Sequence, residues 1–250
     1  MSELTSLKDR VVLVTGASAG IGAATARRLA AAGAAVGVTA RRTDRLDTLC
    51  AEIAASGGRA VAAPADAASL ESVQSAVSAV EEALGPVDAL VNNAGVMTIA
   101  PITENDVDAW SRMIDVNVKG VLHFLSATMP GMIERERGHI VNVGSVAGRR
   151  PFPGATVYSA TKFAVRAITW GLHLELGHAH GIRTTDIQPG YVETELLGDQ
   201  PDTKDAWDAA WEGRRTLQAD DVARTIEFAL TSPDHVSVSE LLVRPTDQPT

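Results

Sequence analysis

Tyr158 and Lys162 lie four residues apart, a spacing that places both side chains on one face of a helix. The ordinary pKa of a tyrosine, about 10, is too high for efficient proton exchange at neutral pH. A neighbouring ammonium favours the phenolate and lowers that pKa. The pair therefore indicates a phenol that acts as acid and base beside a cation, although the same spacing also occurs in ordinary surface pairs.

Ser145 stands thirteen residues before Tyr158 and follows the expected strand Ile140 to Val143. Doubly wound sheets bind ligands at this carboxyl edge, where a hydroxyl can hydrogen-bond a substrate oxygen as negative charge develops on it. The alternative is a turn or helix-cap residue. Asn117 is an amide among apolar helix neighbours, so it needs backbone or water as hydrogen-bond partners once it is buried.

The segment Thr15 to Gly22 is rich in glycine, follows an expected strand and leads directly into an expected helix. Free backbone N–H groups and the helix dipole make such a turn a binding site for a pyrophosphate. Gly16 permits the tight turn, Gly20 the close approach of the phosphates, and Gly22 the packing of helix on strand. A turn with only a structural role is the alternative.

Arg41 and Arg42 occupy the position, about 20 residues beyond the glycines, where NAD-binding sites usually carry a carboxylate for the ribose 2′-hydroxyl. A guanidinium can instead hold a 2′-phosphate through paired, charge-assisted hydrogen bonds. The sequence therefore predicts NADP(H) as the cofactor. Two solvated arginines at the start of the next helix are the alternative, and use of NAD(H) stays open.

Short β-branched runs alternate with amphipathic stretches along the whole chain, which is the sequence form of βαβ units. We therefore expect an α/β protein with a single doubly wound Rossmann domain over residues 1–250, in which helices cover both faces of a seven-stranded parallel sheet. The segment Glu193 to Gly213 is too long for a tight connection and is expected to be a substrate lid. Strands are expected over Val11 to Thr15, Ala35 to Thr39, Ala60 to Ala63, Ala89 to Val91, Ile140 to Val143, Ile182 to Ile187 and Leu241 to Val243, and helices over Ile21 to Ala32, Arg45 to Ala55, Leu70 to Leu84, Val107 to Arg135, Val157 to His180 and Val222 to Leu230.

The bulk properties narrow the choice of partners and compartment. A formal net charge of -9 argues against nucleic acid or an anionic membrane as the main partner. One cysteine, no signal pattern and no long apolar run predict a cytoplasmic protein without an intramolecular disulfide. His173, His178 and His180 cluster near a helix end, but no carboxylate with matching spacing completes a ligand set, so no metal is expected.

Taken together, these motifs resemble the short-chain dehydrogenase/reductase family, in its branch of chains about as long as this one. The resemblance covers nearly the whole chain. It rests on Thr15 to Gly22 as the TGxxxGxG turn, Asn92 to Gly95 as NNAG, Ser145, Tyr158 with Lys162 as YxxxK, and Pro189-Gly190.

The resemblance implies a catalytic tetrad of Asn117, Ser145, Tyr158 and Lys162. In the family, the tyrosine protonates the carbonyl oxygen, the serine orients that oxygen, the lysine tunes the tyrosine, and the asparagine holds a water of a proton relay. It also implies that Asp66 contacts the adenine and that Thr194 meets the carboxamide. The predicted cofactor-binding residues are Gly16, Ser18, Gly20, Ile21, Gly22, Arg41, Arg42, Asp66, Asn93, Ala94, Gly95, Tyr158, Lys162, Pro189, Gly190, Val192 and Thr194.

Two residues depart from the family pattern. Ala19 stands where many NADP-using relatives carry a basic residue, so selectivity for the 2′-phosphate must rest on Arg41 and Arg42. Gly144 stands where another serine is common, a change expected to leave the tetrad intact. The closing segment Leu242 to Gln248 resembles the tails of clavulanate-type aldehyde reductases and of related hydroxy-acid dehydrogenases.

The predicted activity is hydride transfer between NADP(H) and a small-molecule carbonyl or alcohol, as in a ketone or aldehyde reductase. An NADP-dependent epimerase or isomerase with the same tetrad and a non-catalytic NADP-sensing protein are the alternatives. A homodimer or homotetramer is expected through the long helices, while the substrate, direction and stereochemistry stay open. The substrate pocket is expected around Val96, Met97, Val146 to Pro153, Tyr191 and the lid. In the lid, Trp207 and Trp211 either close over a ligand or serve oligomer or domain packing. Arg149 or Arg150 either binds a substrate carboxylate or is a solvated loop residue.

Overall fold

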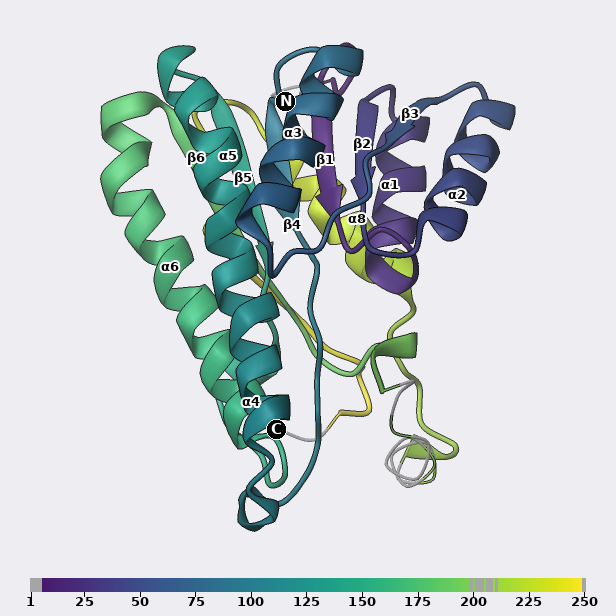
Figure 1. Cartoon of the computed structure of the whole chain (residues 1–250), viewed down its shortest axis with the longest axis vertical. Helices are drawn as coiled ribbons and strands as arrows, with labels where there is room; N and C mark the ends of the chain where they lie inside the picture. Colours follow the sequence, from purple (N-terminus) through teal and green to yellow (C-terminus); the bar gives the residue numbers. More distant parts are fainter. Residues whose placement is uncertain (1–5, 198–199, 201–204, 206–208, 210, 249–250) are drawn as a thin grey trace.

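The computed structural model describes residues 6–197, 200, 205, 209 and 211–248. All of its strand pairs are parallel, and the seven strands form one sheet in the order β3-β2-β1-β4-β5-β6-β7 (Figure 1). The predicted doubly wound parallel sheet is thereby confirmed. The strands are β1 (Val11–Thr15), β2 (Ala35–Thr39), β3 (Arg59–Ala62), β4 (Ala89–Asn92), β5 (Gly138–Val143), β6 (Ile182–Pro189) and β7 (Glu240–Val243).

The strand order reverses between β1 and β4, and this reversal positions the site. The chain first builds outward from β1 to β3 and then crosses to the other side of β1 to add β4. Helices that leave two adjacent strands in opposite directions open a crevice beyond the carboxyl ends of those strands. The register of β1 with β4 pairs Val14 with Val91, so Thr15 and Asn92 end side by side. The glycine turn and the Asn92 to Gly95 segment therefore meet in space.

Helices cover both faces of the sheet, as the alternating pattern predicted (Figure 1). On one face, Leu29, Ile53 and Ile226 pack with the strands in one buried apolar cluster, and on the other face Val80 and Phe124 belong to a second cluster. Strands that are buried on both faces explain the nearly continuous apolar runs in the sequence. The first face carries α1 (Gly20–Ala31), α2 (Thr43–Ala55) and α8 (Ala219–Thr231), and the second carries α3 (Leu70–Leu84), α5 (Gly120–Glu134) and α6 (Thr156–His180).

The helical stretch predicted over Val107 to Arg135 is not one regular helix. It consists of α4 (Val107–Ile114), a π-helical turn (Asp115–Lys119) and α5. A π turn is one residue wider than an α turn and is frequent at functional sites. This turn contains Asn117, whose buried amide is bonded to the backbone of Val96 and to Thr161, so the irregularity coincides with a tertiary anchor.

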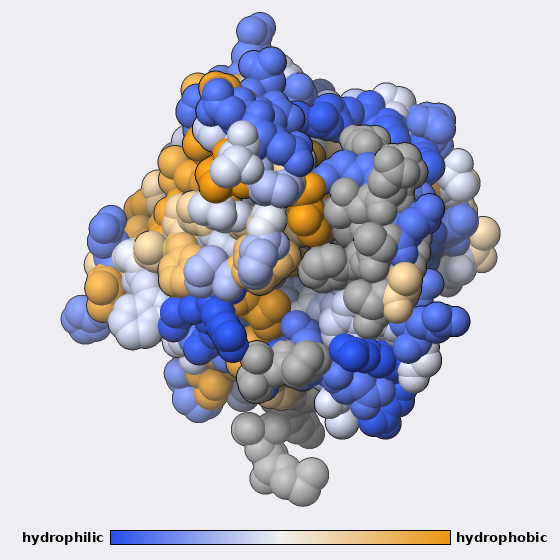
Figure 2. Space-filling model, turned by 90° about the horizontal axis from the view of Figure 1, so that it is seen from below, coloured by the Kyte–Doolittle hydropathy of each residue, from blue (hydrophilic) through white to orange (hydrophobic). Residues whose placement is uncertain are grey.

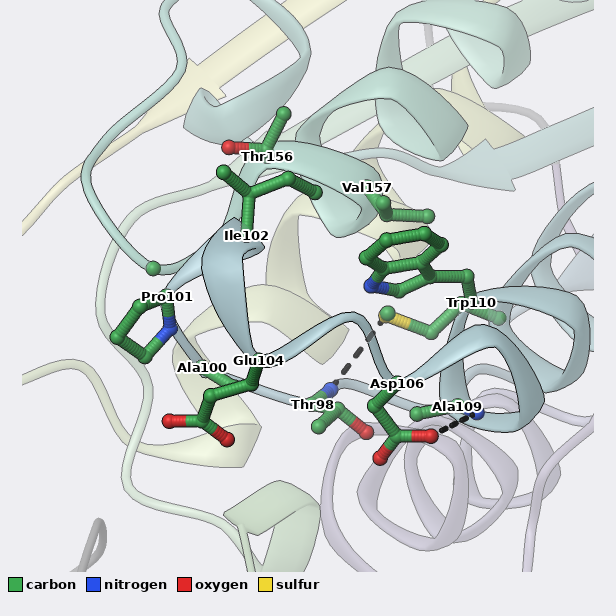
Figure 3. A pocket seen from close by; sticks show the side chains of 12 residues that line it. Thr98, Ala100, Pro101, Ile102, Glu104, Asp106, Ala109, Trp110, Thr156 and Val157 are labelled. Atoms are coloured by element: carbon green, nitrogen blue, oxygen red, sulfur yellow. Dashed lines mark hydrogen bonds between the residues drawn. The ribbon is translucent and has the colours of Figure 1, made fainter.

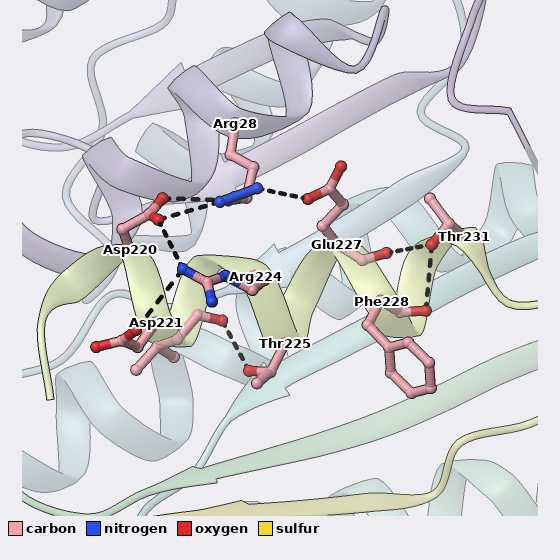
Figure 4. A network of polar contacts seen from close by, with 9 residues as sticks. Arg28, Asp220, Asp221, Arg224, Thr225, Glu227, Phe228 and Thr231 are labelled. Atoms are coloured by element: carbon pink, nitrogen blue, oxygen red, sulfur yellow. Dashed lines mark hydrogen bonds and ion pairs between the residues drawn. The ribbon is translucent and has the colours of Figure 1, made fainter. Parts of the chain in front are cut away.

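An ion-pair network joins α8 to α1, the helix that opens at the glycine turn (Figure 4). The Arg28 guanidinium donates to both carboxylate oxygens of Asp220, at 3.1 and 3.0 Å, and to Glu227 at 3.0 Å. Such partly exposed pairs contribute modestly to stability, so the buried Val222 and Ile226 provide most of the packing energy. The network fixes how α8 lies against α1.

None of the helices in the described part of the chain combines the length and the apolar character that a membrane span requires.

Candidate active site

A cavity of about 1350 Å³ opens at the carboxyl edge of the sheet. Figure 2 views the molecule from this side, where hydrophobic side chains gather near the middle of the face and hydrophilic ones surround them. Segments that follow all seven strands line the cavity, so residues far apart in the sequence converge there. Every predicted site residue lines the cavity except Gly22 and Asn117, which lie behind its wall.

The glycine turn has the shape that a dinucleotide phosphate site requires. Gly16 and Gly20 adopt positive φ angles of 65° and 53°, a region that side chains disfavour. A Cβ on Gly22 would lie 2.5 Å from the carbonyl oxygen of Gly16, so only glycine lets α1 start this close to β1. The turn leads into the N-terminus of α1, whose free N–H groups suit a pyrophosphate. These features fit the predicted cofactor.

Thr15 and Asn93 clamp the turn from behind. The Thr15 hydroxyl accepts hydrogen bonds from the backbone N–H groups of Asn93 and Ala94, at 3.0 and 2.9 Å. The Asn93 amide donates to the carbonyl oxygens of Thr15 and Gly16, at 2.9 and 3.3 Å. Asn93 therefore shapes the cofactor site from within the protein. Sequence reasoning did not assign a role to Thr15, and its only signal was a hydroxyl at the end of an apolar strand.

Two guanidinium groups face the part of the cavity that lies beyond β2. Arg42 donates to the Ser18 hydroxyl at 2.9 and 3.1 Å and to the Glu195 carboxylate at 3.0 Å. Arg45 also binds Glu195, and the two arginines lower the pKa of that carboxyl. The Arg41 guanidinium lines the cavity without a protein partner among the described residues. Arg41 is thus the guanidinium that is available to a 2′-phosphate, while Arg42 is shared with Glu195.

Tyr158 and Lys162 lie together on the first turns of α6 and are both buried, with 6% and 7% of their surface exposed. The Lys162 ammonium lies 5.7 Å from the centre of the Tyr158 ring and donates to the Val143 carbonyl oxygen at 2.8 Å. Ser145 stands two residues after the end of β5, and its hydroxyl is near enough to the phenol to lower the pKa of Tyr158. The structure therefore brings together the phenol, the ammonium and the hydroxyl that the sequence singled out.

The electrostatics of this cluster differ from the prediction. Burial raises the pKa of Tyr158 to about 12, and the hydrogen bond with Ser145 only partly opposes that effect. Burial also lowers the pKa of Lys162 to about 8, against the opposing charge of Asp186. The expectation of a phenol with a lowered pKa was wrong, because desolvation is the largest effect on the pKa of Tyr158. Tyr158 is therefore a neutral phenol at neutral pH and is ready to donate its proton.

Ser145 and Asn117 both have structural partners. The Ser145 hydroxyl accepts from the backbone N–H of Ala147 at 3.1 Å, so its capping role and its contact with Tyr158 coexist. The Asn117 carbonyl oxygen accepts from Val96 N–H at 2.8 Å, and its amide donates to the Val96 carbonyl at 2.9 Å and to Thr161 at 3.1 Å. The side chain of Asn117 thus fixes the loop after β4 against α6.

The substrate side of the cavity is built from loops. Tyr191 stacks on Trp211, with ring centres 4.6 Å apart, while Trp207 lies outside the described residues. Gln200 accepts from Ile99 N–H and donates to the Met97 carbonyl, at 2.9 and 2.8 Å, which joins the segment after β6 to the loop after β4. Much of the predicted lid, including 201–204 and 206–208, also lies outside the described residues.

The two arginines of the loop after β5 have different surroundings. Arg149 is bonded to Gln188 and Glu240, which leaves it unable to meet a substrate carboxylate as it stands. Arg150 lines the cavity.

A separate cavity of about 10 Å³ lies between the loop at Pro101 and Ile102 and the side chain of Trp110 (Figure 3), and it admits roughly one water. Within the described residues, no three or more His, Cys, Asp or Glu side chains form a group that could hold a metal ion.

Comparisons with known proteins agree with this geometry. The family model described as short chain dehydrogenase matches residues 10–205. An uncharacterized oxidoreductase of Staphylococcus saprophyticus is 41% identical over 243 residues, which are 97% of this chain and 100% of that protein. A glycine betaine reductase of Emericella nidulans is 44% identical over 245 residues, but the chain spans only 19% of its length.

Solved structures are similar over almost the whole chain. The closed form of a serine dehydrogenase complexed with NADP+ has a TM-score of 0.90 and 34% identity, and the match covers 96% of each chain. A metagenomic short-chain oxidoreductase in complex with NADP has a TM-score of 0.82 and 33% identity, with 98% of this chain and 100% of that one covered.

Gly22→Ala is expected to weaken NADPH binding by at least about tenfold. The new methyl group would displace the carbonyl of Gly16 and with it the phosphate turn, and a hydrogen bond to a charged group is worth about 1.5–3 kcal/mol. Fluorescence titration of NADPH measures the change. Gly171→Ala is the matched control, because no atom lies within 4 Å of a Cβ at that position of α6. Equal affinity in the two variants would contradict the proposed turn.

Proposed function

This chain belongs to the short-chain dehydrogenase family and is an NADP-dependent oxidoreductase, and on that premise we propose that it interconverts a small-molecule carbonyl and the corresponding alcohol. One observation carries the proposal: the buried phenol of Tyr158 is near both the Ser145 hydroxyl and the Lys162 ammonium, and all three residues line the same cavity as the glycine turn. A proton donor beside a hydride carrier is the arrangement that carbonyl reduction needs.

The cofactor would be held by residues from six segments around the cavity. The backbone of Gly16, Ser18, Gly20 and Ile21 would bind the pyrophosphate, and Arg41 with Arg42 the 2′-phosphate. Asp66 would contact the adenine. When bound, NADP(H) supplies or accepts the hydride. The remaining contacts are assigned to Asn93, Ala94, Gly95, Tyr158, Lys162, Pro189, Gly190, Val192 and Thr194, all of which line the cavity, while Gly22 supports the turn from behind.

The chain's own residues manage the proton. In the direction of reduction, the neutral Tyr158 phenol donates its proton to the substrate oxygen as the carbonyl carbon gains a hydride, and Ser145 hydrogen-bonds that oxygen. The phenolate left behind is stabilised by the Lys162 ammonium and regains a proton from solvent. The carbonyl thus gains one hydride on carbon and one proton on oxygen, which gives the neutral alcohol. In the direction of oxidation, the phenolate accepts the proton instead.

Asn117 acts on this centre indirectly. Its bonds to Val96 and Thr161 hold the wall of the substrate pocket against α6, which carries Tyr158 and Lys162. A residue that keeps reacting groups in place to within a fraction of an ångström can affect turnover strongly. The relay water that the family resemblance assigns to Asn117 belongs to the same proposal.

The substrate would enter between the loop after β4 and the segment after β6. We assign the substrate pocket to Val96, Met97, Phe152, Tyr191 and the aromatic ring of Trp211, which line the cavity. Residues 193–213 would act as a lid on a single domain of residues 1–250. Two bonds between Gln200 and the backbone of Met97 and Ile99 support a closed position of this segment. The names of the similar serine dehydrogenase and glycine betaine reductase support a small-molecule substrate.

Self-association through α5 and α6 belongs to the same proposal. Leu122 on α5 and Phe163, Trp170 and Leu174 on α6 are large apolar side chains that are exposed in the single chain. Apolar side chains that gather on the outer helices of a sheet protein are typical of an interface between subunits. A homodimer or homotetramer would bury them.

Tyr158→Phe is expected to lower kcat by about 10² to 10⁴, the usual contribution of a positioned proton donor, with little change in NADPH affinity. Only a hydroxyl is removed, and the ring keeps its buried position. NADPH consumption with a panel of aldehydes and ketones measures turnover, and fluorescence titration measures binding. Substrate turnover without net NADPH consumption in the unmodified enzyme would instead indicate an epimerase. A kcat of Tyr158→Phe equal to that of the unmodified enzyme would refute the acid role of the phenol.

Arg41→Ala is expected to raise the Kd for NADPH roughly 30-fold while the Kd for NADH changes much less. The variant loses charge-assisted hydrogen bonds to a 2′-phosphate, worth about 2 kcal/mol, and NADH lacks that group. The matched control is Arg27→Ala, because Arg27 carries the same charge but pairs with Glu52 away from the cavity. A similar loss of affinity for both cofactors would contradict the assignment of Arg41.

The rate of carbonyl reduction is expected to fall as the pH rises through about 8. The pKa of Lys162 is lowered from 10.5 to about 8, so the ammonium is present below that pH and is lost above it. The test is the dependence of kcat/KM on pH from neutral pH up to the ordinary lysine pKa of 10.5, where the decline forms the alkaline limb of the profile. Lys162→Arg provides a charge that does not titrate in this range, so its residual activity should lack the limb. A flat profile in the unmodified enzyme would contradict the role of Lys162.

A further inference from the structure

Asp186 is a fully buried carboxylate between the neighbouring strands β5 and β7, and it belongs to none of the sequence motifs. It lies on β6, and 0% of its surface is exposed. Its Oδ2 accepts a hydrogen bond from the Gln188 amide at 2.6 Å. Its Oδ1 has no hydrogen-bond partner in the described part of the chain. An isolated buried carboxylate is costly, so a compensating charge must lie near it.

The unpartnered oxygen points at the strand end that carries the catalytic groups. A Cβ on Gly144 would lie 2.3 Å from Oδ1 of Asp186, so the carboxylate occupies the space that any side chain at 144 would need. Gly144 connects Val143, whose carbonyl binds the Lys162 ammonium, to Ser145. The departure at Gly144 from the family pattern therefore has a physical reason, because a serine there would collide with Asp186.

Two described cations act on Asp186, and of these only Arg166 has a second carboxylate partner among the described residues. From α6, Lys162 and Arg166 act on it, and from β7 the Glu240 carboxylate does. Arg166 is paired with Glu240 at 2.8 Å, and Arg149 with the same carboxylate. By contrast, the hydrogen bond shown for Lys162 goes to a neutral carbonyl. The charge of Asp186 raises the pKa of Lys162 and that of Lys162 lowers the pKa of Asp186, each against the effect of burial.

We infer that Asp186 is a positioning residue whose buried carboxylate keeps the Lys162 ammonium charged, and that Gly144 lacks a side chain in order to admit it. The inference rests on the proposed function for its meaning, since the charge on Lys162 matters through Tyr158. It adds a residue behind the tetrad that touches neither substrate nor cofactor. When the phenol is ionised, negative charges on Asp186 and Tyr158 flank the positive charge on Lys162.

The test observes Lys162 directly, without substrate or cofactor. The chain has four lysines, Lys8, Lys119, Lys162 and Lys204, so carbon-13 labelling at the lysine ε-carbon gives a short NMR spectrum, and Lys162→Met identifies the resonance of Lys162. We expect this resonance to titrate near pH 8 in the unmodified protein and about one pH unit lower in Asp186→Asn, which removes the charge and keeps the shape.

Glu240→Gln is the matched control. It removes another carboxylate of the same network, which acts on Asp186 but is not among the charges that act on Lys162. We expect the Lys162 titration to stay in place in this variant. A midpoint that is unchanged in Asp186→Asn, or that shifts equally in both variants, would overturn the inference. Asp186→Ser gives the same comparison with a smaller neutral side chain if Asp186→Asn impairs folding.

Enzyme kinetics separate this inference from the proposed function. The alkaline limb of kcat/KM in Asp186→Asn should move to lower pH together with the NMR midpoint, whereas a merely structural role would lower the rate without moving the limb. If the NMR midpoint shifts but the unmodified protein shows no NADPH-linked turnover of carbonyls or alcohols, the proposed function fails and the role of Asp186 stands. If turnover occurs and neither observable shifts, only the inference fails.

Discussion

The constraint on which the site depends is the burial of a charged amine at the edge of a parallel sheet. Lys162 is 7% exposed, and moving an ammonium out of water is costly unless protein dipoles or charges replace the lost hydration. Here the replacement comes from the Val143 carbonyl and from the charge of Asp186. The same burial raises the pKa of Tyr158 to about 12. Desolvation thus favours the neutral form of both groups, and at Lys162 the charge of Asp186 opposes it.

The topology of the sheet allows Lys162 to be buried while the cavity beside it stays open. Strands β1 and β4 are adjacent in space although β2 and β3 separate them in the sequence, so their carboxyl ends border one crevice. Thr15 and Asn93 join those two ends through four hydrogen bonds and thereby hold the glycine turn in position. The cavity lies between these joined strand ends and α6, which carries Tyr158 and Lys162.

The sequence predicted the seven strands, their parallel arrangement and the set of residues around the cavity, because apolar runs and fixed motif spacings report local structure. It did not predict three features that depend on contacts distant in the chain. The π turn at Asn117 follows from bonds to Val96 and Thr161, which no helical period reveals. The direction of the Tyr158 pKa depends on burial, which the spacing of Tyr158 and Lys162 does not specify. Arg149 turns to Gln188 and Glu240, residues that reach it only in the folded chain. Trp207 and much of the predicted lid lie outside the described residues.

A net charge of -9 and a cofactor that carries several phosphates require cations that act at short range. The structure offers them as partial charges of backbone N–H groups at the start of α1, and as the guanidinium groups of Arg41 and Arg42. Glu195 neutralises part of that positive charge from the segment after β6, where it pairs with Arg42 and Arg45. On the proposed assignment, a 2′-phosphate and Glu195 would compete for the guanidinium of Arg42. Glu195 lies within the proposed lid of residues 193–213, so its pairing with Arg42 would link the proposed phosphate site to the substrate loops.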